Sequence, residues 1–329
     1  MSNLERDPDE LTCDATPDAA AEGELEVLVL TPREVPLGGP RAMTVRRTLP
    51  QRRQSFVGGW CFVDHYGPDD VSETGGMVVP PHPHTGLQTV SWLFSGEIEH
   101  RDSVGSHAMV RPGELNLMTA GRGITHSEVS TAATRTLHGV QLWVALPEEH
   151  RLVEPGFEHH VPDPVAGDGW TARVFLGTLL GQRSPVSTWS SLLGAELVLE
   201  AGTSLSLDVD PDHEHGLLVD SGAVYLGRTA LAPGDLGYSA PGTPTLTVRA
   251  EETCRLVLLG GTPLGETIVM WWNFVGRSHD DVAAYRANYQ AAIGAEEGGD
   301  DPAQFALVVG DLDPLPAPAL PNARLRPRS

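Results

Sequence analysis

Four side chains between Pro80 and Glu128 have the types and spacing of a divalent-metal site. The stretch opens with His82-Pro83-His84 and closes with His126-Ser127-Glu128. In an extended strand alternate side chains share a face, so the two members of each pair point the same way. If the two strands face each other, three imidazoles and one carboxylate converge, as in the inner sphere of a divalent metal. The sequence therefore predicts metal ligands at His82, His84, His126 and Glu128.

The segments around these residues have the pattern of short strands. Between residues 26 and 146, alternating apolar residues are separated by Gly and Pro turns, and Val140, Leu142, Val144 and Leu146 form one period-two strand. A second strand-rich region runs from 194 to 261. Many short strands at close spacing predict an all-β protein built from barrels or sandwiches.

The two strand-rich regions resemble one repeated unit. A strand ending in Ser95-Gly96 corresponds to one ending in Ser221-Gly222, and Pro112-Gly113-Glu114 corresponds to Pro233-Gly234-Asp235. Two tandem barrels are therefore expected, followed by a short helix from Asp280 to about Ile293 with Ser278 as its N-cap. The predicted divisions are a disordered acidic tail (1–24), a metal-binding barrel (25–147), a linker (148–190), a metal-free barrel (191–265), and a helix and extended tail packing back on the barrels (266–329).

A second His-x-His pair, His213 and His215, is an internal control for the first. His82 and His84 lie 14 and 12 residues before Gly96, and the same distances before Gly222 give Asp208 and Asp210. The second pair is therefore out of register with the ligand positions. No histidine follows Pro233-Gly234-Asp235 to match His126. We expect one barrel to hold metal, with His213 and His215 in structural roles.

Composition limits the partners and the compartment. The formal net charge of −22 over 329 residues opposes direct contact with nucleic acid or an anionic membrane. No run of eighteen apolar residues could cross a bilayer, and the acidic N-terminus has no apolar signal region. The three cysteines, Cys13, Cys61 and Cys254, are widely spaced, which indicates a reducing, cytoplasmic setting.

Three motifs resemble the pirin family of the cupin superfamily. They are the run from His82 to Leu87 (HPHTGL), the run from Met118 to Glu128 (MTAGRGITHSE) and the run from His138 to Val144 (HGVQLWV). The resemblance covers roughly residues 26–329 and implies a bicupin whose N-terminal barrel binds iron through three histidines and one glutamate. By this resemblance the family's ligands correspond to His82, His84, His126 and Glu128. Many cupins place a carboxylate where this chain has Gln88, whereas pirins use the glutamate after the third histidine. The resemblance therefore implies that Glu128 has the carboxylate role and that Gln88 has a supporting one.

The resemblance implies two classes of function. Some pirins resemble quercetin 2,3-dioxygenases, which would bind a small aromatic or enol substrate at Fe(II), with Glu128 as the general base. Mn, Co, Ni and Zn also suit these ligand types. Other pirins resemble iron- or redox-sensing proteins that dock on a transcription factor or a metabolic enzyme. We favour the enzyme. Trp92, Phe94 and Leu117 could line its pocket or fill it.

The remaining candidates have a structural and a functional interpretation. His65, His100, His107 and His138 are expected at the surface or hydrogen-bonded in the core, with His138 nearest the cavity. Gly121 and Gly123 are expected to form a turn needing positive φ, and the alternative is that Arg122 binds an anion. The arginines between 41 and 53 are expected to pair with carboxylates rather than to bind phosphate; they are Arg41, Arg46, Arg47, Arg52 and Arg53.

Overall fold

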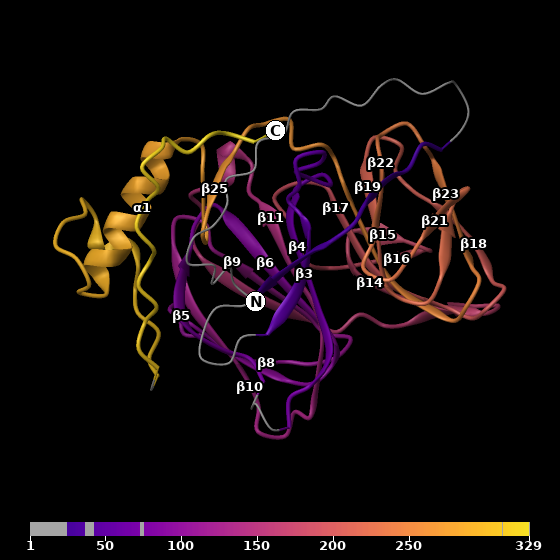
Figure 1. The fold of residues 1–329 in the computed structure, drawn as a ribbon, viewed down its shortest axis with the longest axis horizontal. Helices are drawn as coiled ribbons and strands as arrows, with labels where there is room; N and C mark the ends of the chain where they lie inside the picture. Colours follow the sequence, from indigo (N-terminus) through magenta and orange to yellow (C-terminus); the bar gives the residue numbers. More distant parts are fainter. Residues whose placement is uncertain (1–24, 37–42, 73–75, 311, 329) are drawn as a thin grey trace.

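The computed structural model describes residues 25–36, 43–72, 76–310 and 312–328. The acidic segment 1–24, predicted to be disordered, lies outside the described residues, as do Cys13 and Arg41. Two barrels of β-strands lie side by side, with one helix on the side of the first barrel away from the second (Figure 1). The predicted all-β architecture with a short C-terminal helix is confirmed.

The first barrel is made of two antiparallel sheets. The seven-stranded sheet has the order β12-β9-β6-β11-β4-β3-β2, and the four-stranded sheet has the order β5-β10-β7-β8. Their bounds are β2 Arg33–Pro36, β3 Thr44–Leu49, β4 Trp60–Asp70, β5 Val78–His84, β6 Leu87–Ser95, β7 Ile98–Asp102, β8 His107–Val110, β9 Leu115–Thr119, β10 Ile124–Ser130, β11 Thr136–Ala145 and β12 Gly156–His160.

The second barrel repeats this arrangement. Its larger sheet has the order β1-β22-β19-β24-β17-β14-β13 and its smaller sheet has the order β18-β23-β20-β21, with the hairpin β15-β16 added. A further hairpin, β25-β26, packs instead against the first barrel and the C-terminal helix. Their bounds are β1 Leu28–Leu30, β13 Val165–Gly167, β14 Trp170–Leu176, β15 Thr178–Leu179, β16 Gln182–Arg183, β17 Leu192–Leu199, β18 Ser204–Asp208, β19 Glu214–Ser221, β20 Val224–Leu226, β21 Thr229–Leu231, β22 Leu236–Ser239, β23 Thr245–Ala250, β24 Cys254–Gly261, β25 Val269–Trp271 and β26 Phe274–Gly276.

The turn glycines that suggested the repeat have matching backbone geometry. Gly96 follows β6 with φ 91°, and Gly222 follows β19 with φ 80°. Gly113 and Gly234 likewise have φ of 73° and 94°. These values lie in the left-handed region that glycine enters without steric cost, so each glycine lets its strand turn back into the barrel.

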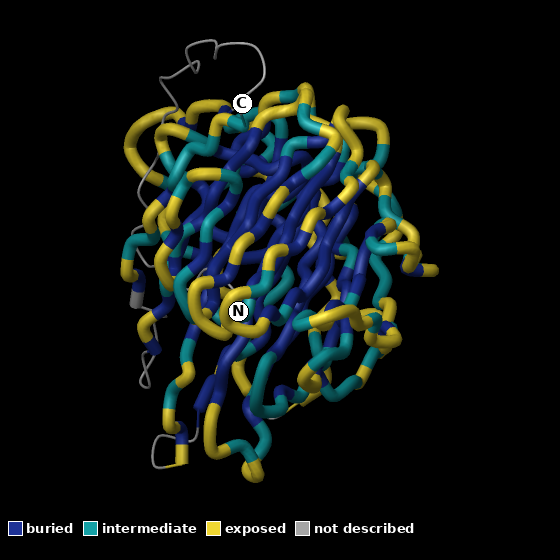
Figure 2. Tube along the Cα trace, turned by 90° about the vertical axis from the view of Figure 1, so that its right-hand side faces the viewer, coloured by how far each residue is buried: buried dark blue, intermediate teal, exposed yellow. Residues whose placement is uncertain are grey.

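One of the hydrophobic core clusters lies between the two barrels and contains residues of both. Alternate residues of β11, Val140, Leu142 and Val144, pack with residues of the second barrel such as Leu218 and Val257. The odd-numbered residues of β11 face the interior of the first barrel instead, as the two-residue period of a strand requires. Buried residues concentrate along the strands and exposed residues in the loops (Figure 2).

Two strands pair with segments that lie beyond a predicted boundary. β1, near the start of the described chain, pairs with β22 of the second barrel, and Leu30 lies opposite Leu236. β12 follows the first barrel in sequence and pairs with β9 of that barrel. The predicted boundaries at residues 147, 190 and 265 stay predictions. The β1-β22 pairing spans the first two of them, and the β12-β9 pairing spans the first.

The C-terminal segment packs against the first barrel. Helix α1 spans His279–Ala292, and Ser278 caps it through the predicted capping box with Asp281. The Tyr289 hydroxyl donates to the Leu315 carbonyl, and the backbone N–H of Leu315 donates to the carbonyl of Pro81 on β5. The tail is thereby tied to the strand that carries His82 and His84. Short 3-10 turns occur at Glu148–His150 and Pro302–Gln304.

Within the described ranges, no helix is both long enough and apolar enough to span a bilayer.

Candidate metal centre

Neighbouring strands of the four-stranded sheet carry the four predicted ligands. β5 and β10 are antiparallel, and His82 lies directly opposite His126. The register then shifts, so that Glu128 pairs with Val79, which leaves Pro80 and Pro81 as the bulge on β5. Proline has no N–H to lose from the ladder, which suits a bulge position.

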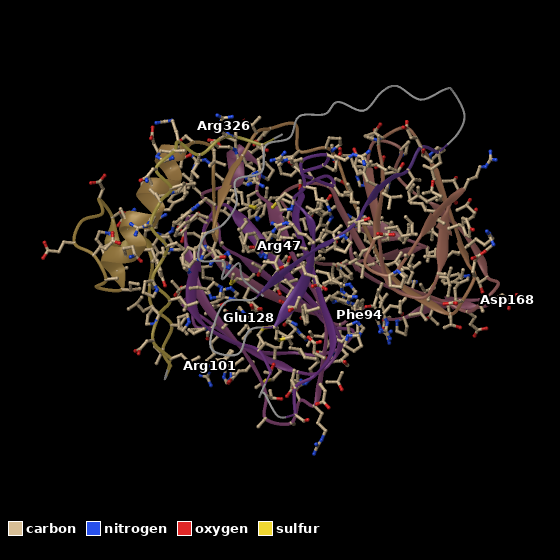
Figure 3. The ribbon with its side chains drawn as sticks, viewed as in Figure 1. Arg47, Phe94, Arg101, Glu128, Asp168 and Arg326 are labelled. Carbon is tan, nitrogen blue, oxygen red and sulfur yellow. The ribbon has the colours of Figure 1, made fainter. Side chains whose placement is uncertain are left out.

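The three imidazoles converge in the interior of the barrel. The ring centroids of His82 and His126 are 4.3 Å apart, those of His84 and His126 are 5.0 Å apart, and those of His82 and His84 are 5.1 Å apart. One ring nitrogen from each lies within 4.8 Å of the other two. Glu128 forms a second such group with His126 and His100. All are buried, and Glu128 lies inside the first barrel (Figure 3).

Burial makes these histidines suitable as ligands. Removal from water lowers the pKa of His82 to about 4, and it lowers the pKa of His84 and His126 well below the usual value. A neutral imidazole keeps a lone pair for a metal, whereas a protonated one does not. Nε2 of His126 is buried, and no hydrogen-bond partner is found for it within the described part of the chain. The donor set and this nitrogen fit a divalent metal.

A chain of polar groups behind His126 sets its tautomer. Oδ2 of Asp102 lies 3.2 Å from Nε2 of His100, and Oδ1 accepts backbone N–H groups of Val104 and Ser106. Since Asp102 accepts the Nε2 proton of His100, Nδ1 of His100 is left as an acceptor. It lies 3.4 Å from Nδ1 of His126. The proton of His126 is then on Nδ1, and its Nε2 lone pair is directed to the metal position.

We expect His100→Phe or Asp102→Asn to weaken metal binding by about 10- to 100-fold, because either change frees the orientation of His126. Competition with a chromophoric chelator would measure the affinity. Asp70→Asn changes an exposed carboxylate and is the matched control. Unchanged metal affinity in both variants would show that the contacts from Asp102 through His100 do not position His126.

Glu128 is held by a serine that also contacts a glutamine. The Ser91 hydroxyl lies 3.3 Å from Oε1 of Glu128 and 2.8 Å from Oε1 of Gln141. This contact fixes the carboxylate on the side that faces the seven-stranded sheet. Gln88, the position suggested for a supporting role, donates its amide to Thr119 on β9.

Several other candidates have structural partners. Arg122 forms an exposed ion pair with Glu154 and stands between Gly121 and Gly123, which both have positive φ. His107 pairs with Glu99 at the surface. Arg47 forms a buried two-point ion pair with Asp64, and the Arg46 guanidinium donates to the Gly67 carbonyl. These contacts are the ones expected of structural residues.

His65 and His138 join the two barrels. Both Nε2 atoms donate to one oxygen of Asp220, on β19 of the second barrel, at 2.6 and 2.5 Å. His138, expected near the cavity, lies instead at this interface, and its ring packs against Phe94. Ligand atoms of the three residues lie close enough for a metal. A guanidinium nitrogen of Arg46, however, lies 3.2 Å from Nε2 of His65, where its charge would repel a cation. We therefore assign His65, His138 and Asp220 as a hydrogen-bonded clamp between the barrels.

The part of the second barrel that corresponds to the candidate metal centre lacks a ligand set. A cavity of about 520 Å³ opens there, beside Asp208, Asp210 and His213. Among the described residues, no three His, Cys, Asp or Glu ligand atoms of this barrel gather within 4.8 Å. Nε2 of His213 lies 2.9 Å from the Ser191 hydroxyl. That this barrel binds no metal stays a prediction.

His215 is expected to make the protein sensitive to acid. Burial, and then the proximity of His213, lower the pKa of His215 to about 4. Below about pH 6.5 His215 binds a proton in the unfolded chain but not in the folded chain. The free energy of unfolding therefore falls as the pH falls from 6.5 to 4. This group alone accounts for roughly 3 kcal/mol across that window. Urea unfolding at pH 7 and pH 4.5 should show a smaller difference for His215→Phe than for wild type, and an equal difference would contradict the assignment.

Some polar residues around the site carry no signal in the sequence. His100 and Asp102 share a face of β7 with the same alternation as the ligands, but nothing in their spacing indicates contact with His126. Tyr66 and Gln141 stand in runs that look like core strands. Their positions emerge only when the two sheets close into a barrel.

Comparison with known proteins identifies the two halves of the chain. A family model described as pirin matches residues 42–144, and one described as the pirin C-terminal cupin domain matches residues 194–293. A Pseudomonas aeruginosa protein, provisionally named a quercetin 2,3-dioxygenase, is 42% identical over 88% of each chain. A pirin-like protein of Caulobacter vibrioides is 37% identical over 80% of this chain and 93% of its own.

A solved structure agrees with these matches. The crystal structure of a quercetin 2,3-dioxygenase from Acinetobacter baumannii superposes with a TM-score of 0.81 at 33% identity, covering 92% of this chain and 98% of the other.

Proposed function

Because this chain belongs to the pirin family of bicupins, we propose that it is a cytoplasmic metal-dependent oxygenase of the quercetin 2,3-dioxygenase type. Its metal is Fe(II), held by His82, His84, His126 and Glu128. The observation that carries the proposal is the convergence of three neutral, buried imidazoles beside a carboxylate. The names of the Pseudomonas and Acinetobacter relatives support the reaction class.

The residues of the chain bind, orient and deprotonate the substrate. Iron would supply Lewis acidity toward a substrate hydroxyl and redox chemistry toward dioxygen. Glu128 accepts the hydroxyl proton of a small aromatic or enol substrate. The Ser91 hydroxyl, 3.3 Å from Oε1 of Glu128, holds that carboxylate in place. Burial of the site excludes water that would compete for the proton and the metal.

Reconstitution with Fe(II) without oxygen, followed by oxygen uptake with quercetin, tests this proposal. We expect uptake that depends on both the metal and quercetin. No uptake by fully metal-loaded protein, with quercetin or with other flavonols and enols, would remove the dioxygenase assignment. It would leave the alternative from the sequence, an iron- or redox-sensing protein that docks on a protein partner.

A further inference from the structure

Three hydrogen-bond donors on one wall of the first barrel are without partners. They are the hydroxyl of Tyr66, the side-chain amide nitrogen of Gln141 and the indole nitrogen of Trp143. No hydrogen-bond partner is found for them in the described part of the chain, and each residue is at most 1% exposed. Tyr66 is on β4 and the other two are on β11, which are neighbouring strands of the seven-stranded sheet.

These donors face the metal ligands across the barrel interior. Gln141 and Trp143 alternate along β11 with residues of the core between the barrels, so their side chains point to the opposite face. Gln141 shares the Ser91 hydroxyl with Glu128. The Trp143 ring stands edge-on to His84, with centroids 5.1 Å apart. A Cβ on Gly139 would lie 3.0 Å from the Tyr66 hydroxyl, which places that hydroxyl in the same interior row.

A buried donor without an acceptor lowers stability, so a row of three needs an explanation. All three are neutral N–H or O–H groups. Burial, and then the charge of Glu128, raise the pKa of Tyr66 well above its usual value, so its hydroxyl keeps its proton. Such a row matches a ligand that presents several neutral acceptor oxygens, such as carbonyl and hydroxyl oxygens on a ring system.

We infer that Tyr66, Gln141 and Trp143 form a donor wall that binds the oxygen substituents of an aromatic ligand and orients it toward the metal. This inference rests on the proposed function and names the part of the site that recognises the substrate. Tyr66 is the member that can be tested most cleanly, since Tyr66→Phe removes one donor and leaves the rest of the wall in place.

The test compares metal-loaded wild type with Tyr66→Phe in an oxygen-free titration with quercetin. We expect quercetin to bind the variant about five- to tenfold more weakly, with metal content unchanged. The same variant should be as stable as wild type or more stable in urea, because it loses an unpaired buried hydroxyl. A purely structural tyrosine would give the opposite pattern, with lower stability and equal affinity.

Tyr225→Phe is the matched control, because Tyr225 lies in the second barrel beneath the Arg249 guanidinium. It should leave quercetin affinity unchanged. Equal affinity of wild type and Tyr66→Phe, or no binding of quercetin by metal-loaded wild type, would overturn the donor wall. Weaker quercetin binding by Tyr66→Phe than by wild type, without oxygen uptake by either protein, would support the wall and rule out the dioxygenase. Oxygen uptake by the wild type, together with an unchanged quercetin affinity in Tyr66→Phe, would rule out the donor wall but not the dioxygenase.

Discussion

Replacing His82 or Glu128 with alanine is expected to abolish or greatly weaken metal binding. Each substitution removes one of the four proposed ligands from a buried site, and three protein ligands hold a divalent metal less tightly than four. Elemental analysis of protein reconstituted with Fe(II) would measure the loss. Metal should also stabilise the wild type, by about 2.7 kcal/mol when its free concentration is 100 times the Kd. A thermal shift on adding metal should therefore be absent from His82→Ala.

His213→Ala is the matched control for His82→Ala. Both residues are buried and both begin a His-x-His pair, but His213 lies in the second barrel against Ser191. We expect His213→Ala to keep the metal content of the wild type. An equal loss from both variants would overturn the one-site model.

Asp220→Asn is expected to destabilise the protein by about 3–5 kcal/mol, because it removes a buried charge that two imidazole N–H groups share. Burial opposes ionisation of Asp220, but the hydrogen bonds from His138 and His65 outweigh it and hold its pKa well below the usual value. Arg255 approaches the other oxygen of the carboxylate at 3.5 Å. Equilibrium unfolding in urea at pH 7 would measure the change.

Asp212→Asn removes an exposed carboxylate of the same barrel and should change stability by less than about 0.5 kcal/mol. A double-mutant cycle with His138→Phe would isolate the clamp, since the two changes should not add. A small effect of Asp220→Asn, or strict additivity in the cycle, would show that the clamp contributes little to the docking of the barrels.

The ligand strands could be predicted from the sequence because they depend on local rules. The two-residue period of a strand places His82 with His84 and His126 with Glu128, whatever the rest of the fold does. The capping box at Ser278 is equally local, and α1 begins at the residue after it. Counting back from Gly96 and Gly222 distinguished the two His-x-His pairs because the turn geometry repeats.

The contacts that depend on closure of the barrels could not be predicted. His100 reaches His126 only because β7 pairs with β10, and a single strand does not specify its neighbour. The clamp joins His65 and His138 to Asp220, a residue 82 positions after His138. Trp92 and Leu117, considered for the pocket, pack instead in the core shared by the barrels. Alternation alone does not say which of two apolar faces is the interior.

The pairing of β1 with β22 has a consequence for the order in which the protein is made. During synthesis β1 leaves the ribosome first, but its partner strand follows about 200 residues later. β1 therefore cannot pair with β22 until most of the protein has been translated. The strands of the first barrel can pair with one another before then. Until β22 has been made, β1 lacks this partner, and an unpaired strand edge favours pairing with other chains.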